Sequence, residues 1–173
     1  MKKLLIVVDM QNDFVTGVLG TKEAKAIVPA VEKLVREFEG DIFFTRDTHG
    51  ENYRNTQEGR KLPVEHCIRD TEGWEIIPEL RDIADQCQVF DKPTFGSVQL
   101  AEHITRIAEK REVDAVYLCG VCTGICVISN AMLLKAAVPE IPIRIVEEAC
   151  ACVTPESHEI ALAAMKNCQI EVV

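Results

Sequence analysis

Residues 113–134 read VDAVYLCGVCTGICVISNAMLL, and this stretch decides which fold the chain adopts. Its first seven residues are almost wholly apolar, which is typical of a strand buried on both faces. Gly120 and Gly124 permit sharp turns, and a helical pattern begins at Ile125. Cys126 therefore falls in a first helical turn, where free N–H groups and the helix dipole favour a thiolate. This placement makes Cys126 a candidate nucleophile.

The composition indicates a globular protein with one domain, residues 1–173. A net charge of −9 argues against nucleic acid as a partner. Eight cysteines would suit a secreted disulfide scaffold. The apolar run at residues 4–8, however, is too short for a signal peptide or a membrane span. We therefore expect reduced thiols, a cytoplasmic location and no membrane association.

Strand-like and helix-like runs alternate along the whole chain, which predicts an α/β fold whose parallel sheet is covered on both faces. A long polar segment, residues 46–78, interrupts the alternation and is long enough to indicate a functional loop. Thr154 and Pro155 predict a helix start. The predicted strands are 4–8, 41–45, 89–90, 113–119, 142–146 and 169–173, and the predicted helices are 24–38, 97–112, 125–137 and 155–167.

Polar side chains follow four of the predicted strands, at the edge where a parallel sheet gathers its working residues. These residues are Asp9, the pair Asp47 and His49, Lys92, and Cys126. We expect their side chains to meet in one crevice. The set contains a thiol, carboxylates and an ammonium group, which together can support nucleophilic catalysis.

Each member of this set has a chemically reasonable role. Asp9 can accept the thiol proton as a general base, and Lys92 can lower the pKa of the Cys126 thiol. The backbone N–H groups of Cys122 and Cys126 can form an oxyanion hole at the turn. A triad histidine is missing, so the arrangement differs from that of papain-like proteases.

Three motifs give the chain a resemblance to a known family. They are IVVDMQNDF at residues 6–14, DKPTFGS at 91–97 and GVCTGICV at 120–127. In order and spacing they resemble the isochorismatase-like cysteine hydrolases, most closely the nicotinamidase branch. The resemblance implies a Rossmann-like, three-layer α/β/α fold with a six-stranded parallel sheet. It also implies that the chain forms homo-oligomers.

The same resemblance assigns the site residues more closely. It implies an Asp9–Lys92–Cys126 triad with Asp9 as acid/base, Lys92 as its charged partner and Cys126 as nucleophile. It further implies a cis peptide bond between Val121 and Cys122.

The long polar segment contains a mixed set of carboxylate and imidazole groups, namely Asp47, His49, Glu58 and His66. Such ligands suit Zn, Mn or Fe. Nicotinamidases are similar in this respect, so the resemblance implies a divalent metal, with zinc preferred, that holds the pyridine nitrogen of the substrate. The spacing from Glu58 to His66 is one residue longer than in relatives.

Aromatic side chains are expected to hold a flat ring in the site. Relatives often carry an aromatic residue just before the last histidine, but this chain has Leu-Pro-Val at residues 62–64. The predicted ring contacts are therefore Phe14, Phe95 and Trp74.

Three functions remain open from the sequence. The leading hypothesis is a metal-assisted cysteine amidohydrolase that converts nicotinamide and water to nicotinate and ammonia through a thioester. The second is a hydrolase of other small amides, carbamoyl amides or ureides. The third is a non-catalytic zinc or redox regulator that uses Cys119, Cys122 and Cys126, of which the first two form a C-x-x-C pair.

Overall fold

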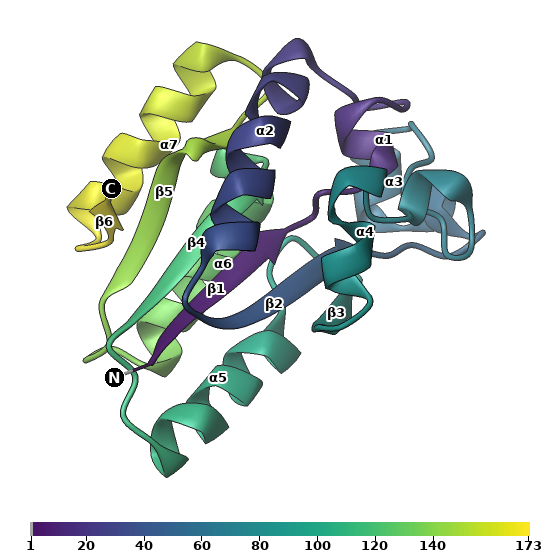
Figure 1. The fold of residues 1–173 in the computed structure, drawn as a ribbon. Helices are drawn as coiled ribbons and strands as arrows, with labels where there is room; N and C mark the ends of the chain where they lie inside the picture. The colour runs from purple at the N-terminus through teal and green to yellow at the C-terminus, as the bar shows by residue number, and fades with distance from the viewer. Residues whose placement is uncertain (1) are drawn as a thin grey trace.

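The computed structural model describes residues 2–173, and its centre is a six-stranded sheet in which all strands run parallel (Figure 1). The strand order β3-β2-β1-β4-β5-β6 confirms the predicted Rossmann-like α/β fold. The strands are β1 (Lys3–Val8), β2 (Gly40–Asp47), β3 (Gln88–Lys92), β4 (Ala115–Val121), β5 (Ile143–Ala151) and β6 (Glu171–Val172).

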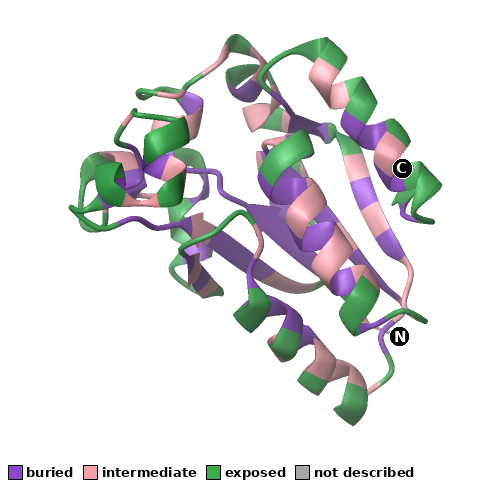
Figure 2. Ribbon diagram, turned by 180° about the vertical axis from the view of Figure 1, so that it is seen from behind, coloured by how far each residue is buried: buried purple, intermediate pink, exposed green. Residues whose placement is uncertain are grey.

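The central strand β1 is buried on both faces. Its residues Leu4 to Val8 have no solvent exposure, and Figure 2 shows the buried strands enclosed by helices. A strand between two helical layers has no face in contact with water, which explains why its sequence is apolar without alternation. The residue that follows β1 is therefore placed deep inside the molecule.

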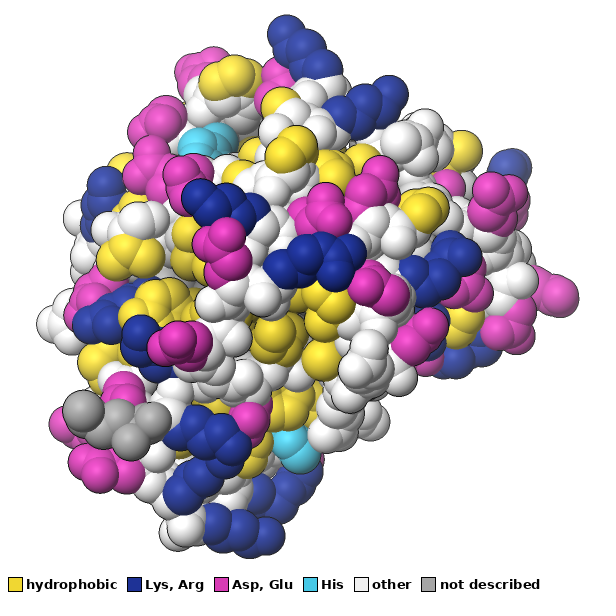
Figure 3. All heavy atoms as spheres, viewed as in Figure 1, with side chains coloured by type: hydrophobic (Ala, Val, Ile, Leu, Met, Phe, Trp, Pro, Cys, Tyr) yellow, Lys and Arg dark blue, Asp and Glu magenta, His cyan; other side chains and the backbone are white. Residues whose placement is uncertain are grey.

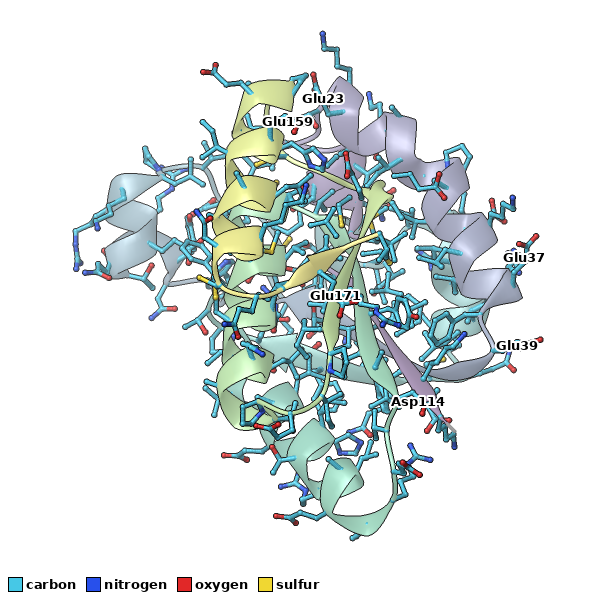
Figure 4. The ribbon with its side chains drawn as sticks, turned by 90° about the vertical axis from the view of Figure 1, so that its left-hand side faces the viewer. Glu23, Glu37, Glu39, Asp114, Glu159 and Glu171 are labelled. Carbon is cyan, nitrogen blue, oxygen red and sulfur yellow. The ribbon has the colours of Figure 1, made fainter. Side chains whose placement is uncertain are left out.

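The helices form two layers, as the right-handed crossovers of a parallel sheet require. Figure 4 shows α2 on one side of the sheet and α6 and α7 on the other. Helix α4 packs against α2, and α5 packs against α6. The long helices are α2 (Lys22–Glu37), α5 (Val98–Lys110), α6 (Ile128–Ala137) and α7 (Pro155–Asn167), with α4 (Pro78–Ala84) shorter.

Three of these helices begin at a residue whose side chain accepts a backbone N–H from the first turn. Thr21 caps α2, Ser97 caps α5 and Thr154 caps α7. Such caps satisfy donors that the helix itself leaves free. The helix start predicted at Thr154 and Pro155 is confirmed.

The turn after β4 differs from the predicted helix at residues 125–137. Thr123–Val127 form a wide π-helical turn, which we call the nucleophile turn, and α6 begins only at Ile128. Gly120 precedes this turn with φ +112°, and a Cβ there would collide with the carbonyl oxygen of Val8. The predicted cis peptide bond between Val121 and Cys122 is present.

The polar segment predicted at residues 46–78 contains several short elements that its sequence does not reveal. Its first two residues extend β2, and helical turns follow at Tyr53–Asn55, α3 (Gln57–Lys61) and Glu72–Trp74. Helix α1 (Asn12–Val15) is equally short. These elements have one or two turns, which is too few for a hydrophobic period to be recognised.

The segment is folded back onto the sheet by a buried anchor. The Tyr53 side chain is fully buried, and its hydroxyl donates to the carbonyl oxygen of Leu62 at 2.9 Å. This anchor places α3 and the residues after it beside the carboxyl end of β2.

Most charged side chains lie on the outside of the molecule, apart from those buried at the carboxyl end of the sheet. Figure 3 shows acidic and basic groups interspersed over one face. Glu37, Glu39 and Glu171, labelled in Figure 4, are exposed. Within residues 2–173 there is no helix that is both long and apolar enough to cross a membrane.

Candidate active site

Three side chains meet at the carboxyl end of the sheet. Asp9 follows β1, Lys92 ends β3 and Cys126 lies in the nucleophile turn. Lys92 Nζ lies 2.6 Å from Asp9 Oδ2 and 3.5 Å from Cys126 Sγ. All three side chains are buried. The structure therefore brings together the three residues that the sequence selects as the catalytic set.

Asp9 is held in place by its backbone and by a neighbouring strand. Its φ of +50° is unusual for a residue other than glycine. Its N–H donates to the carbonyl oxygen of Thr45 at 3.2 Å, and the Thr45 hydroxyl donates to Asp9 Oδ1 at 2.6 Å. Sequence reasoning missed Thr45, which looks like an ordinary β-branched strand residue.

Lys92 is buried without loss of its hydrogen bonds. In addition to Asp9 and Cys126, its ammonium group lies 3.4 Å from Asp47 Oδ1 and donates to the carbonyl oxygen of Thr94 at 3.2 Å. A buried charge is tolerated when it is paired and hydrogen-bonded in this way. Because Asp9 and Asp47 both contact Lys92, the ammonium group lies between two carboxylates.

Burial controls the protonation of the site. It raises the pKa of Asp9 more than the Lys92 ammonium lowers it, and Asp47 adds to the increase. Burial and the Asp9 carboxylate likewise raise the pKa of the Cys126 thiol, against the opposing effect of Lys92. Lys92 thus lowers the pKa of the thiol as predicted, but desolvation by burial outweighs its effect, so that the pKa lies above its ordinary value.

A consequence for the chemistry follows from these shifts. A thiol with a raised pKa needs a base to become a nucleophile. Asp9 is close enough to influence the Cys126 thiol directly and has a raised pKa of its own, which makes it a stronger base than an exposed aspartate.

A cavity of about 360 Å³ opens onto Cys126. Its volume falls in the range of small-molecule sites. Most of the side chains that line it are apolar, and carboxylate and imidazole groups are also among them. The lining residues are Phe14, Leu19, Thr21, Asp47, Glu58, Leu62, His66, Phe95, Cys122, Ile125, Cys126 and Val153.

Two of the three predicted ring contacts lie in this cavity. Phe14 and Phe95 both line it, and Phe95 is 46% exposed at its mouth. Trp74 does not line it. Its indole N–H donates to the Thr48 hydroxyl at 2.8 Å, and the Arg46 guanidinium stacks 3.4 Å from the ring centroid. The prediction that Trp74 contacts a bound ring therefore has no support in the cavity lining, since its buried ring packs against Arg46 and Thr48.

The four predicted metal ligands converge beside the same cavity. Ligand atoms of Asp47, His49, Glu58 and His66 all lie within 4.8 Å of one another. Asp47 Oδ2 is 2.9 Å from His49 Nε2 and 3.5 Å from His66 Nε2. Glu58 joins the group despite its longer spacing, with Oε1 3.6 Å from His49 Nε2. This donor set fits a divalent ion such as zinc.

His66 is oriented for coordination. Its Nδ1 donates to the carbonyl oxygen of Val64 at 2.8 Å, which leaves Nε2 directed toward Asp47 and Glu58. Metal-binding histidines commonly use their second ring nitrogen in this way, since the outer hydrogen bond fixes the ring. The Val64 carbonyl oxygen thus holds the His66 ring in an orientation suited to metal binding.

Gln11 is a further site residue that sequence reasoning missed. Its side-chain oxygen accepts the Asp47 N–H at 2.7 Å, and its amide nitrogen donates to the carbonyl oxygens of Asp47 and Trp74 at 2.9 Å each. Gln11 is fully buried. It therefore fixes the backbone of a candidate metal ligand from both sides.

The clustered cysteines do not form a metal site of their own. Cys119, Cys122 and Cys126 are free thiols. Over the described part of the chain, the groups able to hold an ion contain no cysteine. Burial raises the pKa of Cys119 well above its usual value and that of Cys122 to about 12. This arrangement argues against the zinc or redox regulator.

A second group with metal-ligating atoms lies on the surface, formed by Glu147, His158 and Glu159. Both carboxylates are exposed, and Figure 4 labels Glu159 on α7. The His158 ring nitrogen Nδ1 is 2.8 Å from the Thr123 hydroxyl. Exposed acidic groups of this kind are common without an ion, so the buried Asp47 group remains the candidate.

A thiol beside a buried carboxylate–lysine pair, at the carboxyl end of a Rossmann-like sheet, defines a cysteine-hydrolase class of site. The chain belongs to the isochorismatase family, because the Isochorismatase domain matches residues 3–173. Curated relatives at 26–27% identity include nicotinamidases from yeasts and bacteria. The resemblance seen in the sequence motifs is thereby confirmed.

Three solved structures of amidases are similar to this chain over nearly its whole length. The nicotinamidase/pyrazinamidase of Bacillus subtilis has a TM-score of 0.86 and 27% identity over the full length of both chains. The pyrazinamidase of Pyrococcus horikoshii, solved in complex with zinc, has a TM-score of 0.83 and 30% identity over 100% of this chain and 99% of that one. The N-carbamoylsarcosine amidase of Thermoplasma acidophilum has a TM-score of 0.78 and 26% identity over 99% and 95%.

The ligand geometry predicts which substitutions remove a bound ion. We expect His49→Ala and Glu58→Gln to lower zinc affinity by about 10-fold or more, since each removes a ligand from the group. Cys126→Ala is the matched control and should bind zinc as the wild type does. Titration of the metal-free proteins with zinc by calorimetry measures all three. Zinc binding that depends on Cys126 and not on His49 would contradict the assignment.

Proposed function

We propose that the protein is a metal-assisted cysteine amidohydrolase and that nicotinamide is its preferred substrate. One observation carries the proposal: the Cys126 thiol and the Asp47, Glu58 and His66 side chains line the same cavity of about 360 Å³. A planar amide can therefore reach the thiol with one end and the candidate metal ligands with the other. The nicotinamidase relatives support the same substrate.

The first half of the reaction forms a thioester. Asp9 accepts the Cys126 proton, and the sulfur attacks the amide carbon to give a tetrahedral intermediate. The backbone N–H groups of Cys122 and Cys126 are proposed to hold its oxyanion. Lys92 balances the negative charge that moves between sulfur and carboxylate. The C–N bond then breaks, and the amide nitrogen leaves as ammonia with the proton from Asp9.

The second half hydrolyses the thioester with water. Asp9, again a carboxylate, accepts a proton from the water that attacks the acyl carbon. The C–S bond then breaks, and the thiolate of Cys126 takes that proton from Asp9, so the site returns to its starting state. The second proton of the water leaves with the carboxylic acid product, which ionises in solution and passes it to the released ammonia or to solvent. Lys92 keeps its charge throughout, which is consistent with its raised pKa. Burial alone would lower that pKa, but Asp9, the Cys126 thiolate and Asp47 raise it.

Asp47, His49, Glu58 and His66 are the residues proposed to hold the ion. A bound zinc would offer a coordination position to the pyridine nitrogen and so orient the amide toward the thiol. Phe14 and Phe95 are proposed to contact the ring, since both line the cavity. The ring centroids of Phe14 and His66 are 5.6 Å apart. The residue proposed to contact the substrate ring therefore packs against a proposed metal ligand.

The nucleophile assignment predicts the effect of replacing single cysteines. We expect Cys126→Ser and Cys126→Ala to lower ammonia release from nicotinamide by at least about 10³-fold, because the thioester no longer forms. Cys168→Ala replaces an exposed cysteine and serves as the matched control with unchanged activity. Ammonia is measured by a coupled assay. A Cys126→Ser protein with wild-type turnover would rule out this mechanism.

The hydrogen bond from Thr45 predicts a shift in the pH profile. This bond stabilises the Asp9 carboxylate and so lowers the pKa of Asp9. Thr45→Val should therefore raise the pKa of Asp9. Because Asp9 acts as a base only when it is ionised, the acid limb of kcat/KM should move to higher pH by about 1 unit.

Thr105→Val is the control for this shift, since its hydroxyl bonds only within α5. Rates of ammonia release measured between acid and neutral pH provide both profiles. An acid limb that is the same in Thr45→Val and Thr105→Val would show that Asp9 is not the titrating base.

A second function within the family is favoured by one feature of the cavity. Leu62, from the segment where relatives carry an aromatic residue, lines the wall. The N-carbamoylsarcosine amidase neighbour shares the fold with a different amide. Measuring kcat/KM for nicotinamide, small carbamoyl amides and ureides decides between the two functions. A much higher kcat/KM for a ureide than for nicotinamide would identify the ureide as the substrate.

A further inference from the structure

Asn130 is a buried polar residue that takes no part in the proposed transfer of protons or in substrate binding. It lies on α6, four residues after Cys126, and is 1% exposed. Asparagine is a poor helix former, and a buried amide is destabilising unless its hydrogen bonds are made. The Asn130 amide at this position therefore needs hydrogen-bond partners for both its oxygen and its nitrogen.

Asn130 uses both ends of its amide. Its Nδ2 donates to the carbonyl oxygen of Cys126 at 2.8 Å and to that of Phe95 at 3.2 Å. Its Oδ1 accepts the backbone N–H of Ser97 at 2.9 Å. One bond therefore holds the backbone of the nucleophile, and two bonds hold the segment between β3 and α5.

That segment, residues 93–97, continues directly from Lys92. The Thr94 carbonyl oxygen accepts a hydrogen bond from Lys92 Nζ at 3.2 Å, and Phe95 forms part of the cavity wall. Gly96 lets the segment approach α6 closely, since a Cβ there would lie 2.6 Å from a Leu133 methyl carbon. Residues 93–97 thus provide a hydrogen-bond acceptor for the Lys92 ammonium group and, through Phe95, part of the cavity lining.

We propose that Asn130 is a positioning residue that sets the distance between the Cys126 sulfur and the Lys92 ammonium group. It ties the nucleophile turn to the segment that holds Lys92 and Phe95. Its side chain is outside the lining of the cavity and touches no reacting atom. The expected effect on ammonia release rests on the proposed function. The connection between the nucleophile turn and residues 93–97 rests only on the hydrogen bonds of Asn130.

The chemistry of the amide explains why few residues can replace it. Serine has one hydroxyl, which can bond the carbonyl oxygen four residues back but does not reach the 93–97 segment. Aspartate can still accept from Ser97 but has no donor for Cys126 or Phe95. Asn130→Ser and Asn130→Asp therefore remove different bonds, and both break the tie.

The test measures two properties of both variants. The first is steady-state ammonia release, in which we expect kcat to fall by about 10- to 100-fold while KM changes by less than about threefold. The second is the rate at which iodoacetamide alkylates Cys126, followed by peptide mass spectrometry. We expect this rate to fall by about 10-fold, because the thiolate loses its fixed cation. Ser129→Ala, which removes a neighbouring hydroxyl bonded only to Ile125, should leave both properties unchanged.

The two measurements separate the possible failures. Alkylation needs no amide substrate, so it tests the tie even if nicotinamide is not hydrolysed by the wild type. Urea unfolding gives the folded fraction of each variant, and the use of two variants keeps the test open if one of them does not fold. Wild-type alkylation and kcat in a folded variant would overturn the proposal. A loss of kcat that only follows the folded fraction, with unchanged alkylation, would also overturn it.

Discussion

The buried ion pair between Lys92 and Asp9 is the interaction on which the rest of the site depends. Removing two charges from water is costly, and the pair is stable here because further partners surround it. Thr45 bonds the carboxylate, and the Thr94 carbonyl oxygen and Asp47 contact the ammonium group. Burial inside the molecule is also the largest cause of the raised pKa values of Asp9 and of Cys126.

Lys92 also connects the two halves of the site. Its ammonium group lies 3.5 Å from the Cys126 sulfur and 3.4 Å from an oxygen of Asp47, so it borders the thiol on one side and the candidate metal ligands on the other. A divalent ion among Asp47, Glu58 and the two histidines would compensate the carboxylates that Lys92 alone cannot neutralise. The positions of the thiol and of the ligand group are therefore coupled through one residue.

The sequence is sufficient to predict the fold and the residues that carry charge in the site. Asp9, Lys92 and Cys126 each lie at or after the carboxyl end of a strand, and the geometry of a parallel sheet brings these strand ends together. Asp47, His49, Glu58 and His66 are recognised because metal-ligating residue types are clustered in a long polar segment. Their convergence depends on α3 and on the Tyr53 anchor, which no sequence period reveals.

Other features depend on tertiary contacts that a single sequence does not encode visibly. Gln11 and Asn130 are uncharged amides without a motif of their own, so their roles emerge only from the backbone groups they contact. The residue type of Trp74 predicts a ring contact, but its side chain stacks on Arg46 and does not line the cavity. The neighbouring charges predict that Lys92 lowers the pKa of Cys126, but they do not reveal the burial that raises it further in the opposite direction.

In the proposed enzyme, one cavity combines a thiol for the chemistry with a metal group for substrate binding. The most direct test is the dependence of ammonia release on nicotinamide concentration for zinc-loaded and chelator-treated protein. We expect chelation to raise KM by about 10-fold or more, while the rate at saturating nicotinamide changes by only about threefold or less. An unchanged KM after complete metal removal, or the loss of the saturated rate with an unchanged KM, would contradict it.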